Sequence, residues 1–339
     1  MILIILSTLQ NLSKGDKTKY RDICKNVLDT SFGTYGERIR YVFRGRKVND
    51  LPEHVLSSIF LFADDTKIIK EINSILDSLI VQHDIEALER WSREWLLKFH
   101  PDKCHVLTIG KFENIKHAHP YQLNGEQLEH VFTEKDLGVL IDSDLSFEEH
   151  IAKQVNKANS MLGLLKRRFQ DPSPHVFQTL YTTFVRPHLE YAKSVWQPRL
   201  RRSINLIESV QRRATKLVKP ISRLPYAERL RRLALPSLEF RRLFCDMVQV
   251  YKHIHIYDSK TTPKKFIKRT RPCRKHIHEL QMNFPDDGVR GAQSKSFFYR
   301  TISTWNALPK YVAEASSIKS FKNKLNKAWA NHELLRYLL

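Results

Sequence analysis

The sequence predicts an α+β protein in which a small mixed region is followed by a mostly helical one. Two runs rich in β-branched and aromatic residues, 58–62 and 66–69, flank a short polar pair, which is typical of a β-hairpin. Apolar residues recur at helical spacing over residues 71–97 and again in several segments between residues 148 and 255. The helical part also holds most of the positive charge. The predicted fold class rests on these three observations.

The hairpin carries two neighbouring acids, Asp64 and Asp65, at its tip. Aspartate tolerates turn geometry that branched apolar residues do not. Carboxylate oxygens are natural ligands of Mg²⁺, which usually takes one or two protein carboxylates together with phosphate oxygens of a substrate. The tip therefore predicts a Mg²⁺ seat for phosphoryl or nucleotidyl transfer, with Asp64 and Asp65 as ligands. The alternative is an ordinary pair of surface acids on a turn.

The helix predicted next, residues 71–97, is amphipathic and is expected to pack on a sheet. Pro101 follows it, and proline cannot continue a helix. The apolar stripe is defined by Ile72, Ile75, Leu76, Leu79, Ile80, Leu88, Trp91 and Trp95.

Short strands complete the mixed region. The β-branched run 105–109 predicts a strand. Asn124 and Gly125 favour a tight hairpin turn, because both residues accept positive φ. Further extended runs are expected at 121–123 and 137–141.

The segment Phe62-Ala63-Asp64-Asp65 resembles the catalytic hairpin of reverse transcriptases. The order of hairpin, helix, proline-containing turn and strand is similar to the second half of the reverse transcriptase of jockey-like non-LTR retrotransposons. The resemblance runs from about Asn49 to the end of the chain. Its further motifs are Glu134-Lys135-Asp136-Leu137-Gly138-Val139-Leu140-Ile141-Asp142 followed by His150-Ile151, Pro187-His188-Leu189-Glu190-Tyr191-Ala192, Val195-Trp196, Gln211-Arg212-Arg213-Ala214, Ser296-Phe297-Phe298-Tyr299-Arg300 and Trp305-Asn306-Ala307-Leu308-Pro309.

The resemblance implies a partial palm followed by a thumb-like helical module, RNA and DNA as partners, and Mg²⁺ but no small-molecule cofactor. It implies that Asp64 is the direct metal ligand and that Asp65 assists it. Phe62 would pack near the primer end. Lys103 would approach the nucleotide phosphates and could act as a general acid for pyrophosphate. A plain surface charge is the alternative for Lys103.

The first fifty residues do not match the family pattern. In the family, a strand before the hairpin supplies another metal-binding Asp, and a Gly- and Pro-rich segment contacts the nucleotide. The upstream acid Asp29 is a weak substitute, because it lies too close to Asp64 in sequence, and a turn or capping role suits it better. Two-metal transfer needs carboxylates from separate strands. We therefore expect an incomplete reverse-transcriptase-like chain that is inactive alone. The alternatives are a catalytically dead nucleic-acid-binding remnant and an unrelated phosphohydrolase.

Charge independently indicates a polyanionic partner. The formal net charge is +21, and residues 148–275 hold 29 Lys or Arg against 9 Asp or Glu. Lysine and arginine at this density neutralise nucleic-acid phosphates and release their counterions, which gives salt-sensitive binding with little sequence preference. A solvated helix face is the alternative. The predicted nucleic-acid-binding residues are Phe62, Lys166, Arg167, Arg168, Arg201, Arg202, Arg212 and Arg213.

The helical part is expected to contain several helices whose apolar stripes form a core rather than a cofactor pocket. Trp305 and Trp329 are expected to anchor a C-terminal tail, with base stacking as the alternative. Helices are predicted at 148–169, 174–186, 202–218, 238–255, 294–305 and 316–329. The expected division is an atypical segment 1–48, a partial palm 49–145, a basic helical domain 146–257, a basic linker 258–293 and a helical tail 294–339.

Several other kinds of site are not indicated. The four cysteines form no C-x-x-C pair, which argues against a zinc knuckle or a disulfide framework. Two His-x-His pairs, at 253 and 276, lack acids or cysteines that would complete a zinc site. The apolar opening 1–9 is too short to span a bilayer and has no basic leader. We expect an intracellular protein, nuclear or cytoplasmic, with no signal peptide or membrane helix. Its oligomeric state is left open.

Overall fold

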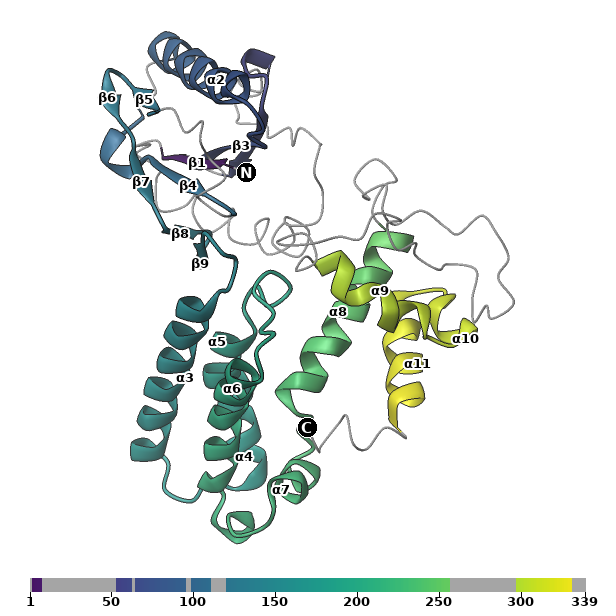
Figure 1. Ribbon diagram of the computed structural model, residues 1–339. Helices are drawn as coiled ribbons and strands as arrows, with labels where there is room; N and C mark the ends of the chain where they lie inside the picture. Colours follow the sequence, from purple (N-terminus) through teal and green to yellow (C-terminus); the bar gives the residue numbers. More distant parts are fainter. Residues whose placement is uncertain are drawn as a thin grey trace. The chain divides into compact units, whose positions relative to one another are not determined.

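The computed structural model describes residues 2–7, 53–62, 65–95, 99–110, 120–256 and 297–330. The chain forms two compact units, Met1–Ser146 and Phe147–Leu339, called here the sheet unit and the helical unit. Small sheets in the first and helices in the second confirm the predicted α+β class (Figure 1).

The sheet unit is built on five strands in the order β2-β3-β1-β4-β7. The central strand β1 pairs antiparallel with β3 on one side and with β4 on the other, and β7 pairs parallel with β4. The strand bounds are β1 Ile2–Ser7, β2 Ser58–Phe62, β3 Asp65–Lys70, β4 His105–Thr108 and β7 Glu129–Val131.

The predicted hairpin is confirmed as β2–β3. Phe62 pairs with Asp65, so the connection between the two strands is two residues long. In β3, Thr66, Lys67 and Ile68 are all buried, because this strand lies inside the sheet and both of its faces are covered.

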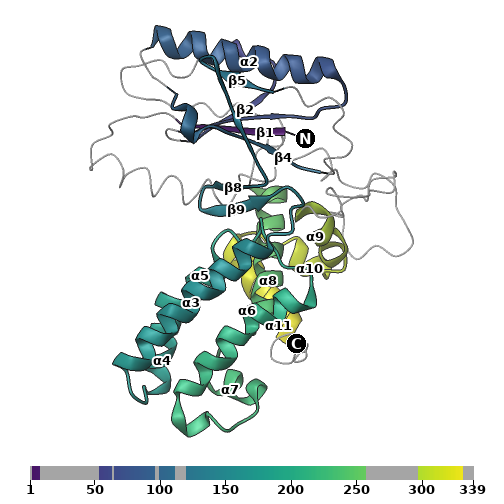
Figure 2. The same ribbon diagram turned by 60° about the vertical axis from the view of Figure 1, so that its left-hand side comes forward.

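Helix α2, Ile75–Glu94, covers one face of this sheet (Figure 2). It begins at Ser74, whose hydroxyl accepts the Asp77 N–H at 3.3 Å while the Asp77 carboxylate accepts the Ser74 N–H at 2.9 Å. This reciprocal capping box satisfies two backbone donors that the first helical turn would otherwise leave open. The face of α2 that packs on Ile68 and Val106 is formed by Val81, Ile85, Leu88 and Trp91.

The predicted apolar stripe of this helix was wrong at its N-terminal end. Ile75, Leu76 and Leu79 are exposed, with 55%, 65% and 46% of their surface accessible. The helix starts four residues later than predicted, and its buried face includes Asp84. The fully buried Asp84 carboxylate accepts the N–H groups of Leu56 and Ser57 at 2.8 Å each, which ties the chain before β2 to α2.

Two short hairpins complete the sheet unit. The turn predicted at Asn124-Gly125 is confirmed between β5, Gln122–Leu123, and β6, Glu126–Gln127, with φ of +53° and +81°. The second hairpin joins β8, Thr133–Asp136, to β9, Val139–Asp142. In Figure 2, the β8–β9 hairpin lies on the side of the sheet away from α2.

The helical unit follows the predicted periodicity closely. A π-helical segment, Tyr181–Val185, joins two of the helices where the sequence predicted a single one. The bounds are α3 Glu148–Arg168, α4 Pro174–Leu180, α5 Arg186–Glu190, α6 Arg201–Ala214, α7 Tyr226–Arg232, α8 Leu238–His255, α9 Phe297–Asn306, α10 Lys310–Ala313 and α11 Ile318–Ala330.

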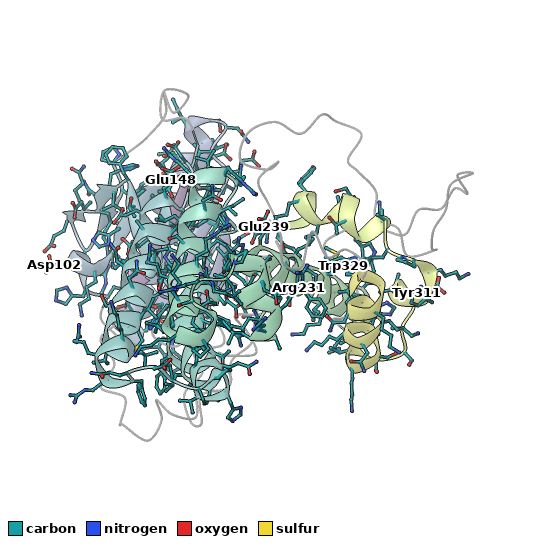
Figure 3. All side chains as sticks on the ribbon, turned by 90° about the horizontal axis from the view of Figure 1, so that it is seen from below. Asp102, Glu148, Arg231, Glu239, Tyr311 and Trp329 are labelled. Atoms are coloured by element: carbon teal, nitrogen blue, oxygen red, sulfur yellow. The ribbon has the colours of Figure 1, made fainter. Side chains whose placement is uncertain are left out.

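The C-terminal helices pack on α8 (Figure 1). Trp305 and Trp329 are buried in this core, so the predicted packing role of both tryptophans is confirmed. Tyr251 of α8 stacks on Phe321 with ring centroids 4.4 Å apart. Figure 3 shows the Trp329 side chain on α11 and Tyr311 on α10. Within the described ranges, we find no helix with the length and apolar character that crossing a membrane requires.

Candidate acidic hairpin and basic helices

The acidic tip lies at one end of the β2–β3 hairpin. Phe62 ends β2 and Asp65 opens β3, and both are half-buried. Asp64 lies outside the described residues. Lys103 is exposed in the short 3-10 turn Pro101–Lys103, which contacts β1. Ile5 of β1 pairs with His105 of β4 in an antiparallel register, so the turn just before β4 lies near Ser7. Ser7 also pairs with Asp65 of β3, so the turn and Asp65 lie at the same end of the sheet.

Strand β1, from the first fifty residues, lies beside the hairpin in the sheet. It pairs with β3 along its whole length, and the residue in register with Asp65 is Ser7. Between Ile2 and Ser7 the strand contains no acid. The neighbouring strand is therefore present, but it brings no carboxylate to the acidic tip. Asp29, the weak substitute considered from the sequence, lies outside the described residues.

The sheet face next to Asp65 is occupied by a buried ion pair. Side chains alternate along a strand, so Asp65 and Lys67 share a face of β3. The Lys67 ammonium pairs with the Asp136 carboxylate of β8, and the two side chains are only 9% and 4% exposed. His105 of β4 lies 2.8 Å from Glu134, also on β8. The β8 strand is thus attached to strands on both sides of β1.

This arrangement limits how a metal could be held. Among the described residues, no group of three or more His, Cys, Asp or Glu could hold an ion. Asp136 is paired with Lys67, and Glu134 lies against His105. At the tip, Asp65 opens β3, and its sequence neighbour Asp64 lies outside the described residues. Two neighbouring carboxylates can serve one Mg²⁺ that takes its other ligands from water and phosphate, whereas a two-ion site needs carboxylates from separate strands.

The two histidines of the His-x-His pair on α8 contact different neighbours. His253 is buried beside Gln249, while the His255 ring lies 3.1 Å from the carbonyl oxygen of Ala313. The pair at 276 lies outside the described residues.

Four of the predicted nucleic-acid-binding arginines are engaged within the helical unit. Arg202 pairs with Glu148, which Figure 3 shows at the start of α3, and Arg201 pairs with Glu239 at 3.3 Å. The other two contacts are Arg213 with the Asn159 side-chain oxygen at 2.8 Å and Arg212 above the Tyr226 ring at 4.5 Å. Lys166, Arg167 and Arg168 lie exposed at the end of α3.

Residues of two resemblance motifs make buried polar contacts in the helical unit. Glu190 accepts a hydrogen bond from Arg241 at 2.9 Å and also lies near Arg186 and Lys193. Burial opposes its ionisation, but Arg241 and the other two cations outweigh burial and hold the pKa of Glu190 below its usual value. Trp196 is buried and donates its ring N–H to the Tyr191 carbonyl at 2.6 Å.

A second polar group joins α6 to its neighbours. Gln211 accepts the Tyr181 hydroxyl at 2.7 Å and donates to the Pro236 carbonyl at 3.1 Å. Glu208 accepts from Tyr226 and from the Leu238 N–H, and burial raises the pKa of this carboxyl. These residues hold the helices together, so they are not surface contacts for a ligand.

Sequence reasoning missed the Lys67–Asp136 pair. Its signal was present, because Lys67 is a cation inside the apolar run 66–69, and a buried cation needs a partner. The identity of that partner, 69 positions away, was not accessible to local patterns.

Acid is expected to weaken the helical unit through His253. This side chain is 4% exposed, and burial, aided by Lys252, lowers its pKa to about 4. An unfolded histidine has a pKa of about 6.5. Below pH 6.5 the unfolded state therefore binds more protons, and the free energy of unfolding should fall by about 2 kcal/mol at pH 5. Hydrogen exchange of α8 amides at pH 7 and pH 5 measures this, and His253→Leu should remove that part of the pH dependence.

The sequence motifs resemble those of jockey-like reverse transcriptases, and comparison with known proteins confirms this likeness. The chain is similar to the "RNA-directed DNA polymerase from mobile element jockey" of Drosophila funebris, with 26% identity over 181 residues that cover 51% of this chain and 19% of the relative. The polymerase of the same name from Drosophila melanogaster is 27% identical over 179 residues, with the same coverage.

An uncharacterised protein of Caenorhabditis elegans is 27% identical over 122 residues, which is 35% of this chain and 61% of that protein. No family model matches the chain. The chain spans about a fifth of the length of the two jockey polymerases. The resemblance to a jockey-like reverse transcriptase seen in the motifs is thus confirmed for part of those relatives.

Proposed function

We propose that this reverse-transcriptase-like chain, derived from a non-LTR retrotransposon, binds RNA and DNA and does not polymerise by itself. The observation that carries the proposal is the register of β1: the residue paired with Asp65 is Ser7, and the strand has no acid. Two-metal nucleotidyl transfer needs carboxylates from separate strands. Preorganised charge is commonly the largest catalytic contribution, so losing one ligand removes most of the rate enhancement.

In this proposal the sheet unit is a palm portion and the helical unit is thumb-like. Asp64 and Asp65 would hold one Mg²⁺, which supplies positive charge to phosphate oxygens when bound. Lys103, at the same end of the sheet, would approach those phosphates, and Phe62 would pack near the end of the primer. Support comes from the shared position of Asp65, Phe62 and the Lys103 turn, and from the likeness to the jockey polymerases.

Binding would be electrostatic and would tolerate many sequences. The net charge of +21 favours any polyanion, and many of the cations lie on the described helices. Contacts to phosphates fix a nucleic acid without reading its bases.

Affinity for an RNA–DNA primer-template should therefore fall steeply with salt. With six to ten phosphate contacts, we expect a loss of about 10³- to 10⁵-fold between 50 and 200 mM salt. Fluorescence anisotropy with a labelled duplex measures this. Asp64→Asn should bind at least as well as the wild type, because it removes a negative charge from the tip. Absence of binding at 50 mM salt would refute the proposed function.

A further inference from the structure

A surface groove with a volume of about 940 Å³ runs along the outer side of α3 in the helical unit. Of its cations, Arg167 was predicted from the sequence, whereas Lys153 and Lys157 were not. The residues that matter for its chemistry are Lys153, Asn156, Lys157, Ser160, Leu164 and Arg167.

Helix periodicity explains why these residues share one side. With 3.6 residues per turn, positions 153, 157, 160, 164 and 167 fall on one stripe. The opposite stripe is the core face of α3, formed by Ile151, Val155, Ala158, Leu162 and Leu165. The groove side faces away from this core stripe, and all six groove residues named above are exposed.

The charge of the groove is positive. Lys153, Lys157 and Arg167 form no ion pair or hydrogen bond with the described residues, in contrast to Arg201 and Arg202 on α6. Glu149 is the acid among the described residues that line the groove. Exposed cations without an internal partner can neutralise an external anion at no cost in lost ion pairs.

The remaining lining residues suit a nucleic-acid strand better than a free phosphate ion. Asn156 and Ser160 offer neutral hydrogen-bonding groups between the cations, and Leu164 is 42% exposed beside them. Hydroxyl and amide groups commonly contact phosphate and sugar oxygens. From Lys153 to Arg167 the helix rises about 21 Å. A single strand carries one charge per about 3.4 Å of helix axis, so the stripe matches roughly six phosphates.

We propose that the α3 groove binds the sugar-phosphate backbone of one nucleic-acid strand, with Lys153, Lys157 and Arg167 as the phosphate-neutralising residues. This inference rests on the proposed function and names the surface that performs it. It keeps Arg167 from the residues predicted from the sequence, adds Lys153 and Lys157, and places the contact on α3 instead of on the arginine pairs of α6.

The test compares two triple variants of the full chain. K153Q/K157Q/R167Q removes three cations from the groove, and K319Q/K322Q/K327Q removes three exposed cations from α11. Both variants lose the same net charge, and glutamine is a good helix former. The slope of log affinity against log salt is measured by anisotropy with single-stranded RNA, single-stranded DNA and duplex probes.

The groove variant should reduce the slope by about 2 for single strands and about 2.7 for a duplex, since each lost contact removes about 0.7 or 0.9. The α11 variant should change it by less than about half as much. Equal changes in the two variants would overturn the groove assignment and leave the proposed function standing. No binding by the wild type would overturn both.

Two further controls keep the outcome interpretable. Circular dichroism establishes folding, and if the triple variant is unfolded, K157Q alone should still lower the slope by about 0.7 to 0.9. Vesicles of phosphatidylserine and phosphatidylcholine test the other polyanionic surface. If the groove variant lost vesicle binding but kept the wild-type salt slope for RNA and DNA, the groove would be a lipid contact and the proposal would be wrong.

Discussion

Replacing Lys67 with methionine is expected to lower the stability of the sheet unit by about 3–5 kcal/mol. The substitution leaves the buried Asp136 carboxylate without its partner. An uncompensated charge in a low-dielectric site is expensive, because water can no longer solvate it. The expected result is faster hydrogen exchange in peptides that contain β3 and β8, measured on the full chain by mass spectrometry.

The matched control for Lys67→Met is the double variant K67M/D136L. Replacing both partners of a buried pair by apolar residues of similar size is often neutral or stabilising. The double variant should therefore recover most of the lost protection. If Lys67→Met alone left exchange unchanged, the pair would not be buried as the structure shows.

The Lys67–Asp136 ion pair lies beside the acidic tip. Lys67 lies two residues from Asp65 on the same strand face, and its partner Asp136 belongs to the β8–β9 hairpin. Breaking the pair would loosen β8 from β3 and disturb the surface beside the acidic tip.

Replacing Glu190 with glutamine is expected to destabilise the helical unit by about 3–5 kcal/mol. The carboxylate is the shared partner of Arg241, Arg186 and Lys193, and its loss leaves three cations close together. Its pKa is lowered, so this stabilisation is present above the usual Glu pKa of about 4.3 and is lost as pH falls through the folded value. Hydrogen exchange of α5 and α8 peptides measures the change.

Glu239→Gln is the matched control for Glu190→Gln. Glu239 pairs with Arg201, whose side chain is 58% exposed, and surface pairs contribute about 0–1 kcal/mol. Each variant replaces a paired glutamate with glutamine. Glu239 lies on α8, and Glu190 is bonded to Arg241 of α8. Comparable losses in the two would mean that the Glu190 cluster is no stronger than a surface pair.

Local signals predicted most of the fold. The β2–β3 hairpin and the Asn124-Gly125 turn follow from residue types within a few positions. Helices α3 and α8 follow from periodicity over whole turns, and their predicted bounds agree closely with the structure. In each case the sequence that determines the element lies inside it.

Long-range pairing could not be predicted in this way. The run 2–7 is short and apolar, and nothing within it indicates that it becomes the central strand between β3 and β4. The buried role of Asp84 is also a long-range feature, because its carboxylate accepts the N–H groups of residues 27 and 28 positions earlier.

Charge density predicted a polyanion-binding unit but not the residues left available. Arg202 and Arg213 belong to dense basic runs, yet Glu148 and Asn159 of α3 engage them. Lys153 and Lys157 are isolated in sequence and become a stripe once α3 forms. Counting cations along the sequence ignores such tertiary contacts, so it does not separate paired cations from unpaired ones.

A primer-extension assay on the full chain tests the central claim most directly. The assay uses an RNA template with a DNA primer, Mg²⁺ and all four nucleotides at a salt concentration where anisotropy shows a complex, with an active reverse transcriptase as positive control. The account predicts a bound primer and no extension, because β1 presents Ser7 opposite Asp65. Extension by the wild type that disappears in Asp64→Asn would contradict it.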